Sequence, residues 1–63
     1  MTEDNELISY LLLLRFGTKE PSLQAAPILN YASIAKTVRK PLQTVRRLIL
    51  LGLQAIKENN VIQ

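Results

Sequence analysis

Five basic side chains lie close together in the chain, and their number and spacing fit the binding of a negatively charged partner. Residues 36–47 carry five positive charges and no negative one. The rest of the chain has three basic residues against all five acidic ones, so the whole positive excess lies in this stretch. Such a cluster is typical of a surface that binds a polyanion, and a solvated charged face is the alternative that composition leaves open. The five residues are Lys36, Arg39, Lys40, Arg46 and Arg47.

Two residue types that are common in enzyme active sites are missing from the sequence. It contains no cysteine and no histidine, which excludes disulfides, thiolate zinc sites and catalysis by either side chain. Its five carboxylates and three scattered serines form no arrangement of a nucleophile, a base and an orienting group. We therefore expect a binding module or a structural protein, with no metal and no cofactor, and an enzyme is the least favoured class.

A length of 63 residues predicts a single domain over residues 1–63. Hydrophobic residues make up 48% and charged residues 21%, a balance typical of a globular protein. The acidic first residues differ from the positively charged start of a secretory signal peptide, so we expect an intracellular protein. The longest apolar stretch, residues 7–14, is shorter than the roughly 20 residues of a membrane span. We expect no membrane partner.

The first predicted element is a helix over residues 4–16, which Gly17 ends. Its inward stripe is expected to contain residues at helical spacing, namely Leu7, Tyr10, Leu11 and Leu14. Two prolines interrupt the following residues, so residues 17–29 are predicted to form a loop. It is long enough to contain a short helix or a short strand at 27–29. We expect Leu23, Ile28 and Leu29 to fix this loop to the core.

Two further helices are predicted on either side of a sharp break. Asn30 is a suitable N-cap for a helix over residues 31–38. Pro41 is expected to lie in the first turn of the next helix, residues 41–51, or just before it, because its missing N–H is harmless there. The predicted inward stripe of this second helix is Leu42, Val45, Leu48 and Ile49, while the residues that face away are Gln43, Arg46, Arg47 and Leu50.

Residues 31–50 resemble a helix-turn-helix motif, in which the second helix lies in the major groove of DNA. Ala35 stands at the position that must be small because the two helices approach closely there. The motif's other buried positions are matched by Ile34, Val38, Val45 and Leu48. With Thr44 before Val45, the pattern is similar to the homeodomain-like superfamily, which includes Tc1/mariner-type transposases, recombinases and many regulators. The turn departs from the common pattern, since Arg39 and Lys40 stand where a glycine and a hydrophobic residue are usual.

The resemblance implies that the chain binds double-stranded DNA. The expected role is that of a transcription regulator or the DNA-targeting domain of a transposase, recombinase or DNA-modifying complex, located in the nucleus or nucleoid. The alternative is a helical protein-interaction or assembly module whose basic helix contacts an acidic protein. Salt dependence separates the two, because phosphate contacts make the affinity for DNA fall steeply with salt.

The resemblance and the helical spacing together give each candidate residue a role. Gln43 is suited to a bidentate contact with adenine, and Arg46 or Arg47 to one with guanine; the sequence leaves open which arginine reads a base. Leu42 is expected to meet DNA at the leading end of the recognition helix. The predicted phosphate contacts, which position the protein without reading sequence, are Lys36, Arg39, Lys40 and Thr44.

The last residues, 52–63, allow more than one structure. Residues 55–58 favour a helix, whereas a turn at 57–60 would give a hairpin and hence a winged helix. We favour a helical or loosely ordered tail, because Asn59-Asn60 is a weaker hairpin signal than Asn-Gly. The predicted fold is thus an all-α, three-helix, homeodomain-like helix-turn-helix bundle, with or without a short C-terminal helix, and the winged helix is the alternative.

Two runs of apolar residues exceed what a small three-helix domain can cover. They predict a homodimer, or docking on a larger protein, through two surfaces. The first consists of Leu11, Leu12, Leu13 and Leu14, and the second of Leu48, Ile49, Leu50 and Leu51.

Overall fold

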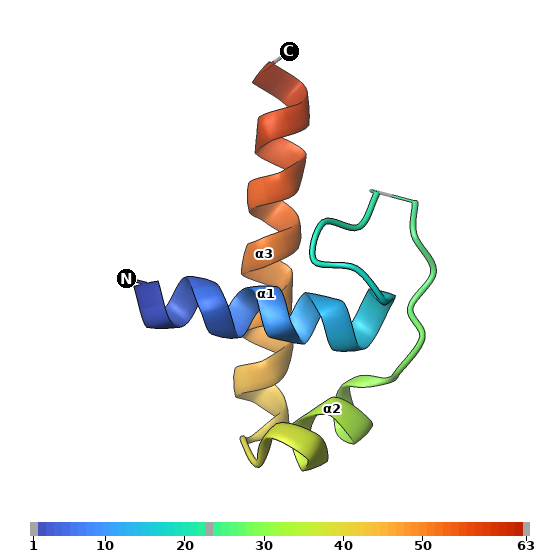
Figure 1. Cartoon of the computed structure of the whole chain (residues 1–63), viewed down its shortest axis with the longest axis vertical. Helices are drawn as coiled ribbons and strands as arrows, with labels where there is room; N and C mark the ends of the chain where they lie inside the picture. The colour runs from blue at the N-terminus through green and yellow to red at the C-terminus, as the bar shows by residue number, and fades with distance from the viewer. Residues whose placement is uncertain (1, 23, 63) are drawn as a thin grey trace.

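The computed structural model describes residues 2–22 and 24–62, and it describes side-chain surroundings for residues 5–22 and 24–58. Three helices form over this part: α1 (Thr2–Phe16), α2 (Tyr31–Val38) and α3 (Leu42–Ile62). α1 lies across the middle of α3, and α2 lies at the N-terminal end of α3 (Figure 1). The described residues include no strand. The predicted all-α three-helix bundle is therefore confirmed, and the winged-helix alternative was wrong.

The helix boundaries follow the predictions at five of six ends to within two residues. α2 has the predicted bounds, and α1 begins two residues earlier than expected. α1 ends just before Gly17, which has a φ of 79° and donates its N–H to the Leu13 carbonyl at 2.8 Å. Asn30 caps α2 as predicted, since its side chain accepts the Ser33 N–H at 2.8 Å.

The predicted end of the recognition helix at residue 51 was wrong. α3 continues without a break through Gly52 to Ile62, so the favoured helical form of residues 52–62 is present, but as a continuation of the same helix and not as a separate tail or short helix. Residues 53–58 are mostly good helix formers, and the helix passes through Gly52 because packing there outweighs its low helix propensity. Gln63, at the end of the predicted tail, lies outside the described residues.

Six buried side chains from all three helices form the core. They are Leu11, Leu12, Ile34, Ala35, Val45 and Ile49. Tyr10 was predicted to face inward and is instead 44% exposed, because α1 turns Leu12 toward α3 in its place. On α3 Ile49 is fully buried, whereas Leu48 is only half-buried at the edge of the core.

Gly52 lets α1 cross α3 at close range. A Cβ atom at this position would lie 2.7 Å from Cγ2 of Ile8 and 3.1 Å from Cδ1 of Leu12, both on α1. Any larger side chain would push the two helices apart. Gly52 therefore determines the position along α3 at which α1 crosses it.

The last turn of α1 holds the loop at residues 28 and 29, whose side chains do not enter the core. Ile28 is 67% exposed and Leu29 is 37% exposed, so the prediction that they fix the loop to the core was wrong. Leu23, the third residue of that prediction, lies outside the described residues. Two hydrogen bonds of the loop backbone hold these residues instead. Ile28 donates its N–H to the Arg15 carbonyl, and the Leu29 carbonyl accepts a hydrogen bond from the Arg15 side chain. The short helix or strand considered at 27–29 does not form.

The two leucine-rich runs are only partly exposed to solvent. Leu11, Leu12 and Ile49 are buried in the chain's own core, because the crossing of α1 on α3 brings both runs together. The predicted surfaces are thereby reduced to Leu13, Leu50 and Leu51, which are between 37% and 49% exposed. In the part of the chain that the structure describes, no helix combines the length and the apolar character that a membrane crossing requires.

Candidate nucleic-acid interface

The basic cluster lies on α2, on α3 and on the short turn that joins them. Ile34 and Ala35 on α2 are buried in the same core as Val45 on α3, so the two helices pack against each other through these residues. The backbone leaves α2 at Arg39 and enters α3 at Leu42. Pro41 lies just before α3, where its carbonyl accepts the Val45 N–H at 3.1 Å. The chain thus bends sharply at residues 39–41, as the sequence predicts.

Arg39 closes α2 in the left-handed conformation, with φ 59° and ψ 45°. Its N–H reaches the Ala35 carbonyl, which also accepts the Lys40 N–H at 3.1 Å. This capping geometry is usually occupied by glycine, and a side chain there costs on the order of 1 kcal/mol. Arg39 is the one non-glycine residue with a positive φ among the described residues. Arg39, which stands where the common form of the motif has a glycine, thus adopts the conformation that glycine favours, and its basic side chain is exposed.

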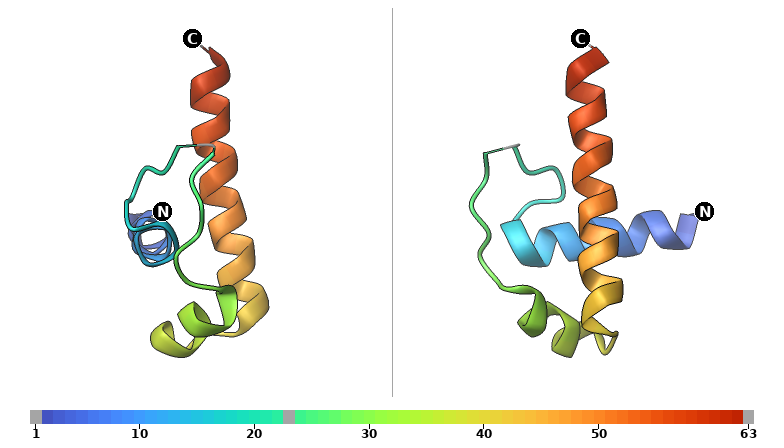
Figure 2. Two further views of the ribbon diagram at one scale, coloured as in Figure 1. Left: turned by 90° about the vertical axis from the view of Figure 1, so that its right-hand side faces the viewer. Right: turned by 180° about the vertical axis from the view of Figure 1, so that it is seen from behind.

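The structure exposes nearly every predicted DNA-contacting side chain. Thr44 is half-buried. The exposed ones are Lys36, Arg39, Lys40, Leu42, Gln43, Arg46 and Arg47. α1, the loop and α2 lie on one side of α3, so none of them covers its opposite side (Figure 2). Together with Thr44, these seven exposed residues of α2, the turn and the N-terminal half of α3 form the candidate surface, which we call the basic face.

The described carboxylates lie away from the five basic side chains. Glu6 belongs to α1 and Glu20 to the loop. Glu58 is on α3, eleven residues after Arg47 and therefore roughly 16 Å farther along the helix axis. That distance exceeds the Debye length of about 8 Å at physiological salt, so Glu58 weakens the positive potential of the basic face little.

The outward side of α3 continues one turn beyond the predicted residues, beside the basic face. Gln54 is exposed and continues the series of outward positions formed by Gln43, Arg47 and Leu50, and its Nε2 donates a hydrogen bond to the Glu58 carboxylate at 3.5 Å. It was missed because the recognition helix was expected to end at residue 51. The spacing of four, three and four residues from Gln43 to Gln54 is the signal that could have identified it.

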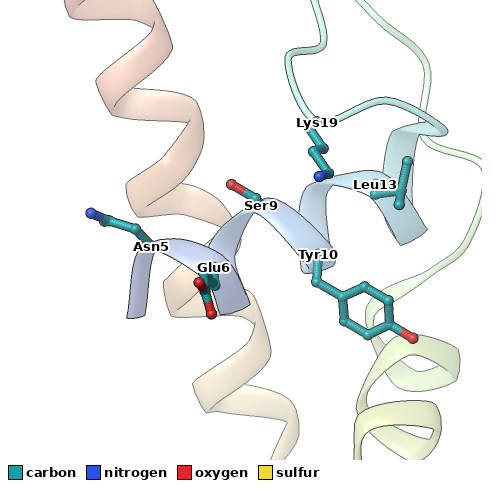
Figure 3. A pocket seen from close by; sticks show the side chains of 6 residues that line it. All are labelled: Asn5, Glu6, Ser9, Tyr10, Leu13 and Lys19. Carbon is teal, nitrogen blue, oxygen red and sulfur yellow. The ribbon is translucent and has the colours of Figure 1, made fainter. Parts of the chain in front are cut away.

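A shallow pocket lies elsewhere, on α1 and the start of the loop (Figure 3). Its volume is about 400 Å³. It is lined by Asn5, Glu6, Ser9, Tyr10, Leu13 and Lys19. No residue of the basic face contributes to it, and its lining combines single polar groups of different types. The described residues contain no group of three or more potential metal-binding side chains.

The geometry of the basic face is the main source of functional information for this chain. Comparisons with models of known protein families, with curated proteins and with solved structures find no match to this chain.

Proposed function

We propose that this chain binds double-stranded DNA through the basic face, with the N-terminal half of α3 in the major groove. The observation that carries the proposal is the exposure of five basic side chains on two helices whose buried sides pack together and on the turn that joins them. These side chains are Lys36, Arg39, Lys40, Arg46 and Arg47. In a helix-turn-helix, the second helix enters the groove while the first helix and the turn contact the phosphates.

The shape of α3 supports this docking mode. An α-helix with its side chains is about 10–12 Å wide, and the major groove of B-DNA is about 12 Å wide. The outer side of α3 is not covered by α1, α2 or the loop, so the helix can enter a groove without rearrangement (Figure 2). Lys36 and Lys40 lie at the end of α2 and in the turn, where phosphates beside the groove are within reach.

We assign the chain a binding role rather than a catalytic one. The proposed context is transcription regulation, or DNA targeting within a transposase, recombinase or DNA-modifying complex in the nucleus or nucleoid. The three-helix arrangement and the break at residues 39–41 fit the homeodomain-like form of the motif.

The exposed leucines favour a second candidate function, that of a helical interaction or assembly module. Leu50 and Leu51 are 47% and 49% exposed on α3, and Leu13 is 37% exposed on α1. A second copy of the chain or a larger protein could cover them. This function is compatible with DNA binding if the partner leaves the basic face free, and it replaces DNA binding if an acidic protein occupies that face.

Chemical-shift mapping by NMR tests the proposal. A short random-sequence duplex is added to the isotope-labelled chain, and the backbone amide signals are followed. We expect progressive shifts for residues 36–47, with little change in the first turns of α1. An unchanged spectrum at low salt contradicts DNA binding. Shifts confined to Leu13, Leu50 and Leu51, appearing as the protein concentration rises without DNA, would support the assembly module instead.

A further inference from the structure

The buried residues of α3 define the direction in which the helix faces the rest of the protein. Val45 and Ile49 are fully buried, and Gly52 contacts α1. Successive residues of an α-helix are turned by about 100°, so these three positions fall within an arc of about 60°. The middle of this arc points to the core, and the opposite direction points to the partner of the basic face.

The two arginines of α3 differ in their position relative to this direction. Arg47 comes two residues after Val45 and two before Ile49, so it points about 160° away from both. Gln43 comes two residues before Val45 and also points about 160° away from it. Arg46 comes three residues before Ile49 and points only about 60° from it. Arg47 and Gln43 thus face outward, whereas Arg46 projects to the side of the helix.

A helix that fills the width of the major groove meets two different surfaces. Its outermost side chains reach the base edges on the groove floor, and its lateral side chains meet the phosphates at the walls. We infer that Arg47 reads a guanine, that Gln43 reads a nearby adenine, and that Arg46 is a phosphate contact. This inference rests on the proposed function and adds the residues that give it sequence preference.

The spacing of the two residues also predicts the form of the DNA site. Gln43 and Arg47 are four residues apart, which corresponds to about 6 Å along the helix axis. Base pairs are stacked about 3.4 Å apart, so the two bases are expected to lie about two base pairs apart. The preferred ligand is therefore a B-form duplex with a guanine and an adenine at this separation.

Selection from a random duplex pool, followed by affinity measurements, tests this assignment. We expect the whole chain to enrich a guanine and an adenine about two base pairs apart. Replacing the guanine should weaken binding by roughly 5- to 150-fold for the unmodified chain. Arg47→Ala should abolish that difference, and Arg47→Lys should reduce it while leaving the salt dependence unchanged, because lysine keeps the charge but loses the bidentate fork. Arg46→Ala should weaken binding to all duplexes alike.

Circular dichroism of each variant checks that its helices remain intact. Two results overturn the assignment while the proposed function stands: tight binding to random duplex without any enriched sequence, and loss of guanine preference in Arg46→Ala rather than in Arg47→Ala. Failure of the unmodified chain to bind any duplex at low salt overturns both the assignment and the proposed function.

Discussion

The guanidinium carbon of Arg15 lies 3.9 Å from the centre of the Tyr31 ring. This contact joins the last turn of α1 to the first residue of α2. Nη1 of Arg15 also donates a hydrogen bond to the Leu29 carbonyl at 2.8 Å, and the Arg15 carbonyl accepts the Ile28 N–H. Arg15 therefore holds both the loop and the start of α2, which sets how α2 is presented beside α3.

Arg15→Ala is expected to lower the free energy of unfolding by about 1–3 kcal/mol, because it removes a cation–π contact and a hydrogen bond from a charged donor. Urea unfolding followed by circular dichroism measures the change. Lys19→Ala is the control, since Lys19 is exposed and its loss should stay within about 0.5 kcal/mol. Equal stability of the two variants would show that Arg15 does not link α1 to α2.

Gly52→Ala is expected to destabilise the protein although alanine is the better helix former. The gain in helix propensity is about 1 kcal/mol, and overpacking of a core typically costs about 1–3 kcal/mol. The new Cβ would lie 2.7 Å from the Ile8 methyl group, so the cost should exceed the gain. Thermal unfolding of this variant, compared with Ala55→Gly at an exposed position of α3, measures the balance. A rise in the melting temperature of Gly52→Ala would contradict the close crossing of α1 and α3.

Arg39→Gly is expected to have opposite effects on stability and on DNA binding. Glycine relieves the left-handed backbone, so the free energy of unfolding should rise by about 0.5–1 kcal/mol. Loss of a basic side chain from the basic face should weaken binding and make the slope of log affinity against log salt about one unit shallower. Chemical unfolding and a binding titration on the same sample measure the two effects. An unchanged affinity would remove Arg39 from the interface.

Ala35→Leu is expected to destabilise the fold by about 1–3 kcal/mol through overpacking between α2 and α3. Ala35 is 9% exposed and lies in the core beside Ile34. Ala32→Leu on the exposed side of α2 is the matched control and should be close to neutral. A fully stable Ala35→Leu variant would mean that the helices do not approach closely at this residue.

Much of the fold was predictable because local signals and tertiary packing agree. Asn30 and Gly17 mark helix ends through side-chain and backbone geometry that depends on neighbouring residues only, and Pro41 marks the break before α3. The exposure of Arg46 and Arg47 follows from their spacing relative to Val45, which is a core residue.

The wrong predictions concern features of the fold that tertiary contacts determine. α1 is apolar around most of its circumference, so periodicity could not choose between Tyr10 and Leu12 as core residues. The close approach of α1 to α3 at Gly52 places Leu12 against α3. It also explains why a glycine stands within a continuous helix. Ile28 and Leu29 were expected to fix the loop because they are apolar, yet Arg15 holds their backbone instead. A long-range contact made by a charged side chain leaves no periodic signal in the sequence.

The salt dependence of binding to a random duplex is the most direct test of DNA recognition by the basic face. Four or five phosphate contacts predict a slope of log affinity against log salt of about −4. The double variant Arg46→Gln, Arg47→Gln should bind more weakly, with a slope about one to two units shallower. The double variant Lys19→Gln, Lys57→Gln loses the same charge away from the N-terminal half of α3 and should keep the original slope. A slope near zero for the unmodified chain, or equal losses in both double variants, would contradict recognition of DNA by this face.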